Sequence, residues 1–123
     1  MKKPKFDFAS YNIDIDVAGH TFMLDCSTET AEYLGSVSAD LRGMIKDIAE
    51  GKELNTAVSD YCENVIDRLL GKGATEKIFT GRRKNVDDLT DVLMFLSKTI
   101  GSFQQERKAA RGKPFTVLKN NGK

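Results

Sequence analysis

The chain has 123 residues, 40% of them hydrophobic and 30% charged, with a formal net charge of +1. This length supports one hydrophobic core rather than two, and the composition is neither that of a disordered chain nor that of a membrane protein, because no apolar run approaches the roughly 18 residues of a membrane-spanning helix. No apolar stretch follows the basic N-terminal arm, residues 1–10, so we expect no secretion signal and a cytoplasmic location.

Residues 11–26 predict a β-hairpin. Apolar and polar residues alternate from Tyr11 to Val17, and the alternation resumes after Ala18 and Gly19, which we interpret as a two-residue turn. The cross-strand pairs produced by this turn all place their side chains on one face: Val17 with His20, Ile15 with Phe22, Ile13 with Leu24, and Tyr11 with Cys26. Because an isolated hairpin is only marginally stable in water, helices are expected to cover this face.

Three helices are predicted after the hairpin, because apolar residues recur there at helical spacing. Their expected ranges are residues 28–50, 56–70 and 85–111. Ser27 or Thr28 can cap the first helix, which Gly35 and Gly43 could bend or break. Asn85 can cap the third helix, with an acid at the reciprocal capping position.

The segments between and after the helices complete the predicted organisation. Residues 71–81 form a glycine-bounded connector with one short turn that presents Ile78 and Phe79. Gly112 and Pro114 are expected to end the third helix and to leave a polar tail, residues 112–123. The sequence thus predicts an α+β fold: one domain, residues 11–111, in which an N-terminal β-hairpin precedes a mainly α-helical bundle of three principal helices.

The residues that catalysis or metal binding would need are scarce. His20 is the only histidine and is expected to be a structural neighbour of Val17 beside the turn. Cys26 and Cys62 lie in apolar patterns without a Cys-x-x-Cys pair, so we interpret them as buried thiols rather than a disulfide or zinc ligands. Two acidic groups are interpreted as a solvated hairpin face and a first helical turn: Asp14, Asp16 and Asp25; and Asp87, Asp88 and Asp91. We expect no enzyme, no catalytic residue, no bound metal and no cofactor.

Charge is distributed unevenly along the chain. Residues 7–67 hold 13 acidic and 3 basic residues, whereas residues 68–123 hold 5 acidic and 13 basic ones. This asymmetry permits head-to-tail association into a homo-oligomer or the binding of an acidic partner, whereas two solvated faces are the simpler interpretation. The basic residues that could contact nucleic acid form two clusters: Arg82, Arg83 and Lys84 before the third helix; and Arg107, Lys108 and Arg111 near its end. No aromatic residue is interleaved with them, and the acidic middle of the chain would repel phosphate, so nucleic-acid binding is the less favoured alternative.

Three passages resemble the small tail assembly chaperones of long-tailed bacteriophages, particularly phages of Gram-positive bacteria. Residues 13–22, Ile-Asp-Ile-Asp-Val-Ala-Gly-His-Thr-Phe, resemble the strand pair that precedes the helices of those proteins. Residues 62–71 with 74–79 resemble their passage of helix, Leu-Gly and short amphipathic turn, and residues 87–96 resemble their last helix. The resemblance covers roughly residues 10–105 as a pattern rather than as one diagnostic motif.

The resemblance implies a non-enzymatic function in the host cytoplasm. Such chaperones bind the long, helical and apolar tape measure protein, keep it soluble and help to gather the tail tube protein around it. A physical route is the packing of a client helix in a groove. The apolar residues that the fold cannot all hide are the candidates for this contact, although the core is the simpler interpretation of each: Ile78, Phe79, Phe95 and Phe103. A small structural or interaction module of a phage particle is the alternative function.

Overall fold

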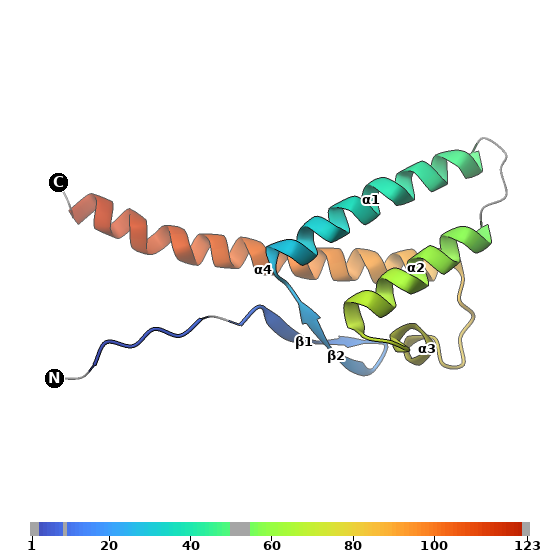
Figure 1. The fold of residues 1–123 in the computed structure, drawn as a ribbon, viewed down its shortest axis with the longest axis horizontal. Helices are drawn as coiled ribbons and strands as arrows, with labels where there is room; N and C mark the ends of the chain where they lie inside the picture. The colour runs from blue at the N-terminus through green and yellow to red at the C-terminus, as the bar shows by residue number, and fades with distance from the viewer. Residues whose placement is uncertain (1–2, 9, 50–54, 122–123) are drawn as a thin grey trace.

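The computed structural model describes residues 3–8, 10–49 and 55–121 of the chain. It has the predicted α+β fold, with a two-stranded antiparallel hairpin followed by helices (Figure 1). The elements in chain order are β1 (Asn12–Val17), β2 (His20–Asp25), α1 (Thr28–Ala49), α2 (Asn55–Leu70), α3 (Ala74–Ile78) and α4 (Val86–Asn121). The protein is mainly α-helical, as its apolar periodicity indicates.

The hairpin has the predicted register. Val17 is paired with His20, and the pairing continues to Asn12 and Asp25. Beyond it, the backbone N–H of Cys26 donates to the carbonyl oxygen of Tyr11 at 2.8 Å. Ala18 and Gly19 have φ angles of 53° and 84°, the two left-handed conformations of a type I′ turn, whose twist matches that of the strands. The turn is also held by the carboxylate of Asp16, whose Oδ1 accepts the N–H of Gly19 at 2.8 Å.

The start of α1 is fixed by Ser27. Its hydroxyl oxygen accepts the backbone N–H of Thr30 at 3.3 Å, which identifies Ser27 as the N-cap. The carboxylate of Asp25 in turn accepts the N–H of Ser27 at 3.0 Å and the hydroxyl of Thr30 at 3.0 Å. These bonds join the end of β2 rigidly to the first turn of α1, and α1 then continues through Gly35 and Gly43 without a break.

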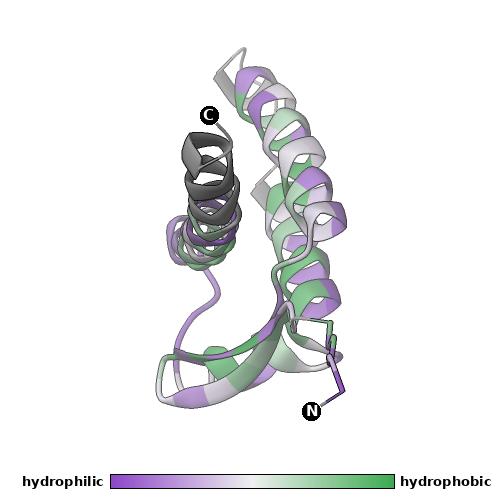
Figure 2. Cartoon of the chain, turned by 90° about the vertical axis from the view of Figure 1, so that its left-hand side faces the viewer, coloured by the Kyte–Doolittle hydropathy of each residue, from purple (hydrophilic) through white to green (hydrophobic). Residues whose placement is uncertain are grey.

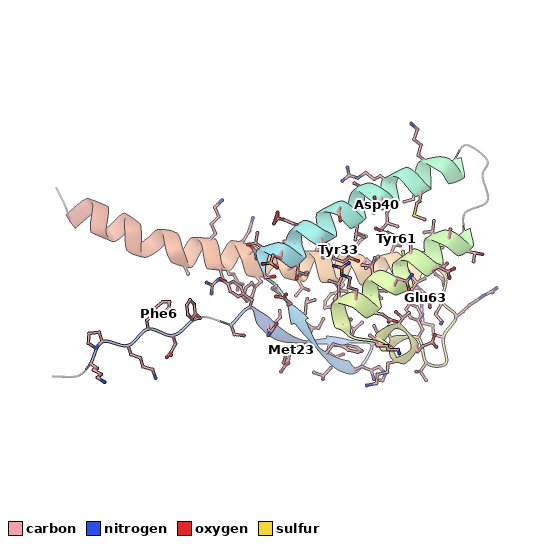
Figure 3. All side chains as sticks on the ribbon, viewed as in Figure 1. Phe6, Met23, Tyr33, Asp40, Tyr61 and Glu63 are labelled. Atoms are coloured by element: carbon pink, nitrogen blue, oxygen red, sulfur yellow. The ribbon has the colours of Figure 1, made fainter. Side chains whose placement is uncertain are left out.

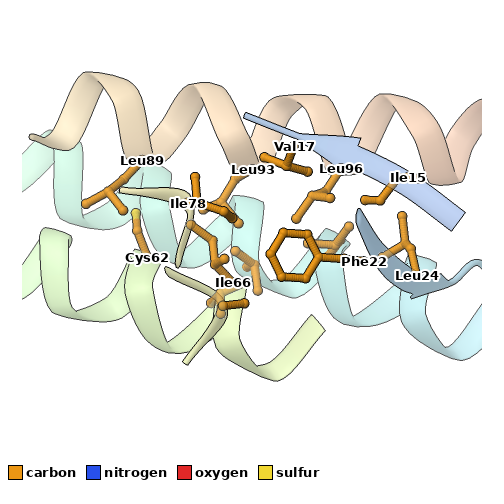
Figure 4. Close-up of a cluster of buried hydrophobic side chains, with 14 of the residues drawn as sticks. Ile15, Val17, Phe22, Leu24, Cys62, Ile66, Ile78, Leu89, Leu93 and Leu96 are labelled. Carbon is orange, nitrogen blue, oxygen red and sulfur yellow. The ribbon is translucent and has the colours of Figure 1, made fainter. Parts of the chain in front are cut away.

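The helices form two layers over the hairpin. Seen along α4, that helix lies on one side and α1 and α2 on the other, with the hairpin below (Figure 2). Hairpin and helices both contribute to one hydrophobic core, part of which is drawn in Figure 4. Its side chains with no more than 1% exposure are Leu24, Cys26, Val58, Cys62, Val65, Ile66, Leu89 and Leu96.

Two boundaries differ from those predicted. The connector of residues 71–81 contains a complete short helix, α3, rather than a turn alone. The third principal helix was predicted to end at residue 111, with a tail beyond it, and this is wrong because α4 continues through Gly112 and Pro114 to Asn121. In a helix interior glycine costs about 1 kcal/mol and proline about 3 kcal/mol relative to alanine, so both weaken a helix without dictating its end. The predicted end of α1 at residue 50 lies outside the described residues.

Candidate functional site

A groove of about 380 Å³ opens where the hairpin turn meets α3 and the first turns of α4. We call it the tip groove. The hairpin contributes Asp16, Val17 and Ala18; the α3 region contributes Ile78, Phe79 and Arg82; and α4 contributes Asp88, Asp91, Val92 and Phe95. Val17, Ile78 and Phe79 are buried, whereas Phe95 keeps 43% of its surface exposed. The tip groove therefore has an apolar floor and a partly uncovered aromatic side chain beside it.

The floor is held in place by a buried polar contact between α2 and α3. Gly71 and Gly73 have φ angles of 112° and 83°, a left-handed backbone that reverses the chain after α2. Thr75, 1% exposed, donates its backbone N–H to Oδ1 of Asp67 at 2.8 Å, and its hydroxyl lies 2.8 Å from the same oxygen. The hydroxyl is also 3.2 Å from the carbonyl oxygen of Glu63. Thus α3 is anchored along α2, which turns Ile78 and Phe79 into the core.

The rim of the tip groove carries charges, and most are acidic. Arg82 binds the carboxylate of Asp88 through Nε at 2.9 Å and Nη2 at 2.8 Å. Asn85 donates its amide to the same carboxylate at 2.9 Å and accepts the backbone N–H of Asp88 at 2.8 Å, which confirms the predicted cap. The bonds from Arg82 and then Asn85 lower the pKa of Asp88 below its ordinary value of 3.8. With Asp16 and Asp91, the rim has three acids and one base, a net charge of −2.

The predicted contact residues fall into two places. Ile78, Phe79 and Phe95 meet at the tip groove. Phe103 lies eight residues further along α4, or roughly 12 Å at 1.5 Å per residue, and its ring centroid is 6.1 Å from that of Tyr11. Phe103 thus belongs to the opposite, open end of the hairpin.

The two basic clusters are also separate. From the start of α4 to Arg107 the distance along the helix is roughly 30 Å. Lys84 binds the carboxylates of Glu76 and Glu63, which together raise the pKa of Lys84. The guanidinium of Arg107 lies over the ring of Tyr11, 4.6 Å from its centroid. These contacts, and the pairing of Arg82 at the rim, occupy the basic groups with partners inside the chain.

The remaining predicted basic residues differ in position. Arg83 and Lys108 are exposed, and the side chain of Arg111 lies outside the described residues. Lys108 and Arg107 belong to a second, more polar groove of about 430 Å³ between the start of α1 and the middle of α4, lined also by Tyr11, Thr28, Gln104 and Gln105. Gln104 donates its amide to the carbonyl oxygen of Cys26 at 2.6 Å and so ties this groove to the hairpin.

The residues weighed for catalysis occupy structural positions. His20 is half-buried beside Phe22, with ring centroids 6.4 Å apart. Cys26 and Cys62 are free and buried, as predicted. Burial, with a smaller contribution from Asp25 or Glu63 beside each, raises the pKa of both thiols. Within the described residues no group of three or more histidines, cysteines and acids could hold a metal ion, and no helix is long and apolar enough to cross a membrane.

One feature escaped the sequence analysis, which treated the N-terminal arm only as basic. Phe6 and Phe8 are exposed to 76% and 88%, and their rings contact each other edge to face with centroids 4.8 Å apart. The signal was present: two phenylalanines follow the lysines of the arm and precede the first strand, outside any periodic pattern that would bury them. Together the two rings form a small exposed apolar patch on the arm.

Comparison with known proteins identifies the family. A protein family described as a family of unknown function (DUF6673) matches residues 12–121. The chain belongs to this family. The match begins with the hairpin and includes every residue of the tip groove, while residues 3–8 of the arm precede it. No curated protein and no solved structure matches the chain.

Proposed function

We propose that this DUF6673 protein is a non-enzymatic binding protein that holds an apolar helical segment of a client protein in its tip groove. The observation that carries the proposal is the exposure of Phe95. Its side chain is 43% exposed beside the apolar floor of the tip groove, which the hydrogen bonds between Thr75 of α3 and Asp67 of α2 hold in position. An aromatic side chain that is already fixed by its helix loses little conformational freedom when a partner covers it. The acidic rim would attract a client segment that carries lysine or arginine.

The resemblance to phage tail assembly chaperones names the client. In this proposal the protein acts in the host cytoplasm, where it binds helical stretches of the tape measure protein and keeps them soluble during tail assembly. In the same proposal the tail tube protein is a further partner. Side chains four residues apart on a client helix are about 5–6 Å apart, so neighbouring apolar residues of one helix face could enter the tip groove together.

Co-expression tests this function. The chain is expressed with the longest open reading frame within a few genes, and solubility and co-purification of the long protein are measured. Phe95→Ala is expected to reduce co-purification by at least tenfold. Met94→Ala is the matched control, because Met94 neighbours Phe95 on α4 and is 58% exposed but does not line the tip groove.

Two outcomes would overturn the proposal. If the long protein is equally insoluble with and without the chain, the chaperone function is wrong. If Phe95→Ala and Met94→Ala reduce co-purification equally, the client does not bind in the tip groove. Retention of the chain in purified phage particles would instead favour the structural role, since a chaperone leaves before assembly is complete.

A further inference from the structure

The N-terminal arm is an exposed segment that carries both basic and aromatic residues. Its described part, residues 3–8, forms no helix or strand and runs away from the hairpin as an extended chain (Figures 1 and 3). Residues 1–8 contain three lysines and one aspartate, a net charge of +2 without the terminal amine. The two phenylalanines on either side of Asp7, Phe6 and Phe8, are more exposed than any other large hydrophobic side chain that the structure describes.

The tip groove has the complementary properties. Its floor is apolar and includes the buried side chains of Val17 and Phe79, and the exposed side of Phe95 is available to aromatic side chains. Its rim has a net charge of −2, opposite in sign to the arm. Two further grooves between described residues fit the arm less well. The groove at Tyr11 is more polar and has Arg107 and Lys108 at its edge, which would repel lysines. The groove between α1 and α4 is lined by glycines, serines and aliphatic side chains, with no charge to pair with the arm.

The arm cannot place both phenylalanines in the tip groove of its own chain. The arm enters the hairpin at Tyr11, whereas the groove lies at the other end of β1, beside Val17. Six residues of extended strand from Tyr11 to Val17 span roughly 20 Å. Phe8 is three residues before Tyr11, so even a fully reversed arm would carry it only about 10 Å back along the strand. Phe6 and Phe8 can therefore occupy the tip groove together only when they belong to another molecule.

We propose that the arm of one copy docks in the tip groove of a second copy through Phe6 and Phe8, so that chains associate head to tail. The two surfaces of this contact are different, and each copy keeps one free arm and one free groove. Such a contact closes into a ring when its rotation permits and otherwise continues as an open chain. The inference rests on the proposed function only in treating the tip groove as a protein-binding surface. A client helix and the arm would compete for it.

Sedimentation velocity of the full chain, without any client, tests the association. The mean mass is expected to rise with protein concentration and to fall as salt is raised from 0.1 M to 1 M, because the screening length shrinks from about 10 Å to about 3 Å. Phe6→Ser with Phe8→Ser removes the arm contact, and Phe95→Lys removes the groove contact. Each of these variants is expected to stay monomeric at concentrations where the unmodified chain associates.

Mixing the two variants gives the decisive result. The arm variant retains an intact groove and the groove variant retains an intact arm, so the mixture is expected to form a 1:1 complex that grows no further. A full chain that is monomeric at every concentration overturns the inference. Undiminished association of the arm variant, or a mixture that stays monomeric while both variants keep the circular dichroism of the unmodified chain, overturns it too.

A second pair of variants, in which the charges of the rim and the arm are exchanged, tests the same contact in case Phe95→Lys does not fold. Asp91 is an exposed rim residue and Lys5 an exposed arm residue, so neither substitution disturbs the core. Asp91→Lys is expected to weaken association severalfold, and Lys5→Glu on the partner copy is expected to restore part of it. Absence of any restoration contradicts the assigned contact.

The association and the client function can fail independently. The arm variant lacks the self-contact but keeps the tip groove, so it should solubilise the client at least as well as the unmodified chain. Loss of client binding with intact self-association would reject only the chaperone function. A monomeric chain that still binds its client would reject only the arm contact.

Discussion

The corner where α2, α3 and the start of α4 meet differs sharply from the outer half of α1, although both carry apolar residues at helical spacing. In the corner, Cys62 and Ile66 are fully buried (Figure 4), and the hydroxyl of Thr75 is hydrogen-bonded to Asp67. In the outer half of α1, Leu41 and Met44 are only half-buried and Ile45 is 54% exposed. The hydrogen bond of 2.7 Å from the Tyr61 hydroxyl to Asp40 joins the two regions (Figure 3). Apolar periodicity marks a helix face, whereas the burial of that face depends on which other elements reach it.

A pair of isoleucine truncations should expose this difference most strongly. Ile66→Ala removes a fully buried side chain and is expected to lower the free energy of unfolding by about 2–5 kcal/mol, through lost transfer energy and the cavity left behind. Ile45→Ala is the matched control and should change it by no more than about 0.5 kcal/mol. Urea denaturation measures both, and equal costs would show that the outer half of α1 is as tightly packed as the corner.

The polar anchor of the corner should be the next largest contribution. Thr75→Val keeps the shape of the side chain but removes its hydroxyl from Asp67 and Glu63, at an expected cost of about 1–3 kcal/mol. Ser36→Ala removes a similar hydroxyl on α1, where it donates to the carbonyl oxygen of Tyr33 at 2.7 Å in an exposed position. That control should cost less than about 0.5 kcal/mol. A Thr75→Val protein as stable as the unmodified chain would mean that α3 is held by apolar packing alone.

The hairpin turn at the edge of the corner offers a substitution that should increase stability. Ala18 holds a φ of 53°, a conformation that costs a residue with a Cβ about 1–2 kcal/mol and costs glycine little. Because glycine also makes the unfolded chain more flexible, the net gain expected for Ala18→Gly is about 1 kcal/mol or less. Gly19→Ala should have the opposite sign, since a Cβ there meets open space and only the φ of 84° opposes it. Thermal unfolding of the two variants checks these signs, and a loss of stability in Ala18→Gly would show that the turn is not strained.

The smallest expected effect is a pH dependence at the rim of the tip groove. The pKa of Asp88 is lowered in the folded protein by Arg82 and Asn85. A lowered pKa contributes stability that is present above the ordinary value of 3.8 and is lost as the pH falls through the folded value. Asp88→Asn should therefore destabilise the protein at pH 7 but not at the acid end of the titration. Asp87→Asn, an exposed neighbour in the same turn, is the control. Parallel stability curves for the Asp88→Asn and unmodified proteins between pH 7 and the onset of acid unfolding would contradict this assignment.

The hairpin and the principal helices could be predicted because their signals are local. Alternation from Tyr11 to Cys26 permits one register that sorts the side chains, and Asn85 is followed by the residues that its cap requires. The end of α4 could not be predicted in this way. Gly112 and Pro114 are local signals too, but each gives only the free-energy cost of that residue within a helix. Whether the helix ends there depends on the sum of such costs and of the stabilising interactions along the whole helix.

The candidate site could be predicted only in part, because its properties arise from contacts between distant residues. Ile78, Phe79 and Phe95 were identified as apolar candidates, yet their gathering against Val17 depends on how α3 is anchored to Asp67. The ammonium group of Lys84 is paired with the carboxylate of Glu63, which lies 21 residues earlier in the chain. No spacing rule connects these two positions, so their pairing follows from the packing of α2 against the start of α4.

The two buried cysteines can report how often two different parts of the molecule open. Cys26 lies at the junction of the hairpin and α1, and Cys62 lies in α2 within the corner; both are fully buried, and burial raises the pKa of both thiols. An alkylating reagent reacts with an exposed thiolate, so each cysteine is labelled only when its surroundings open. The labelling rate of Cys26 thus measures how often the hairpin separates from the helices, and that of Cys62 how often the corner opens. The ratio of the two rates would show whether the protein opens as one unit or in two steps.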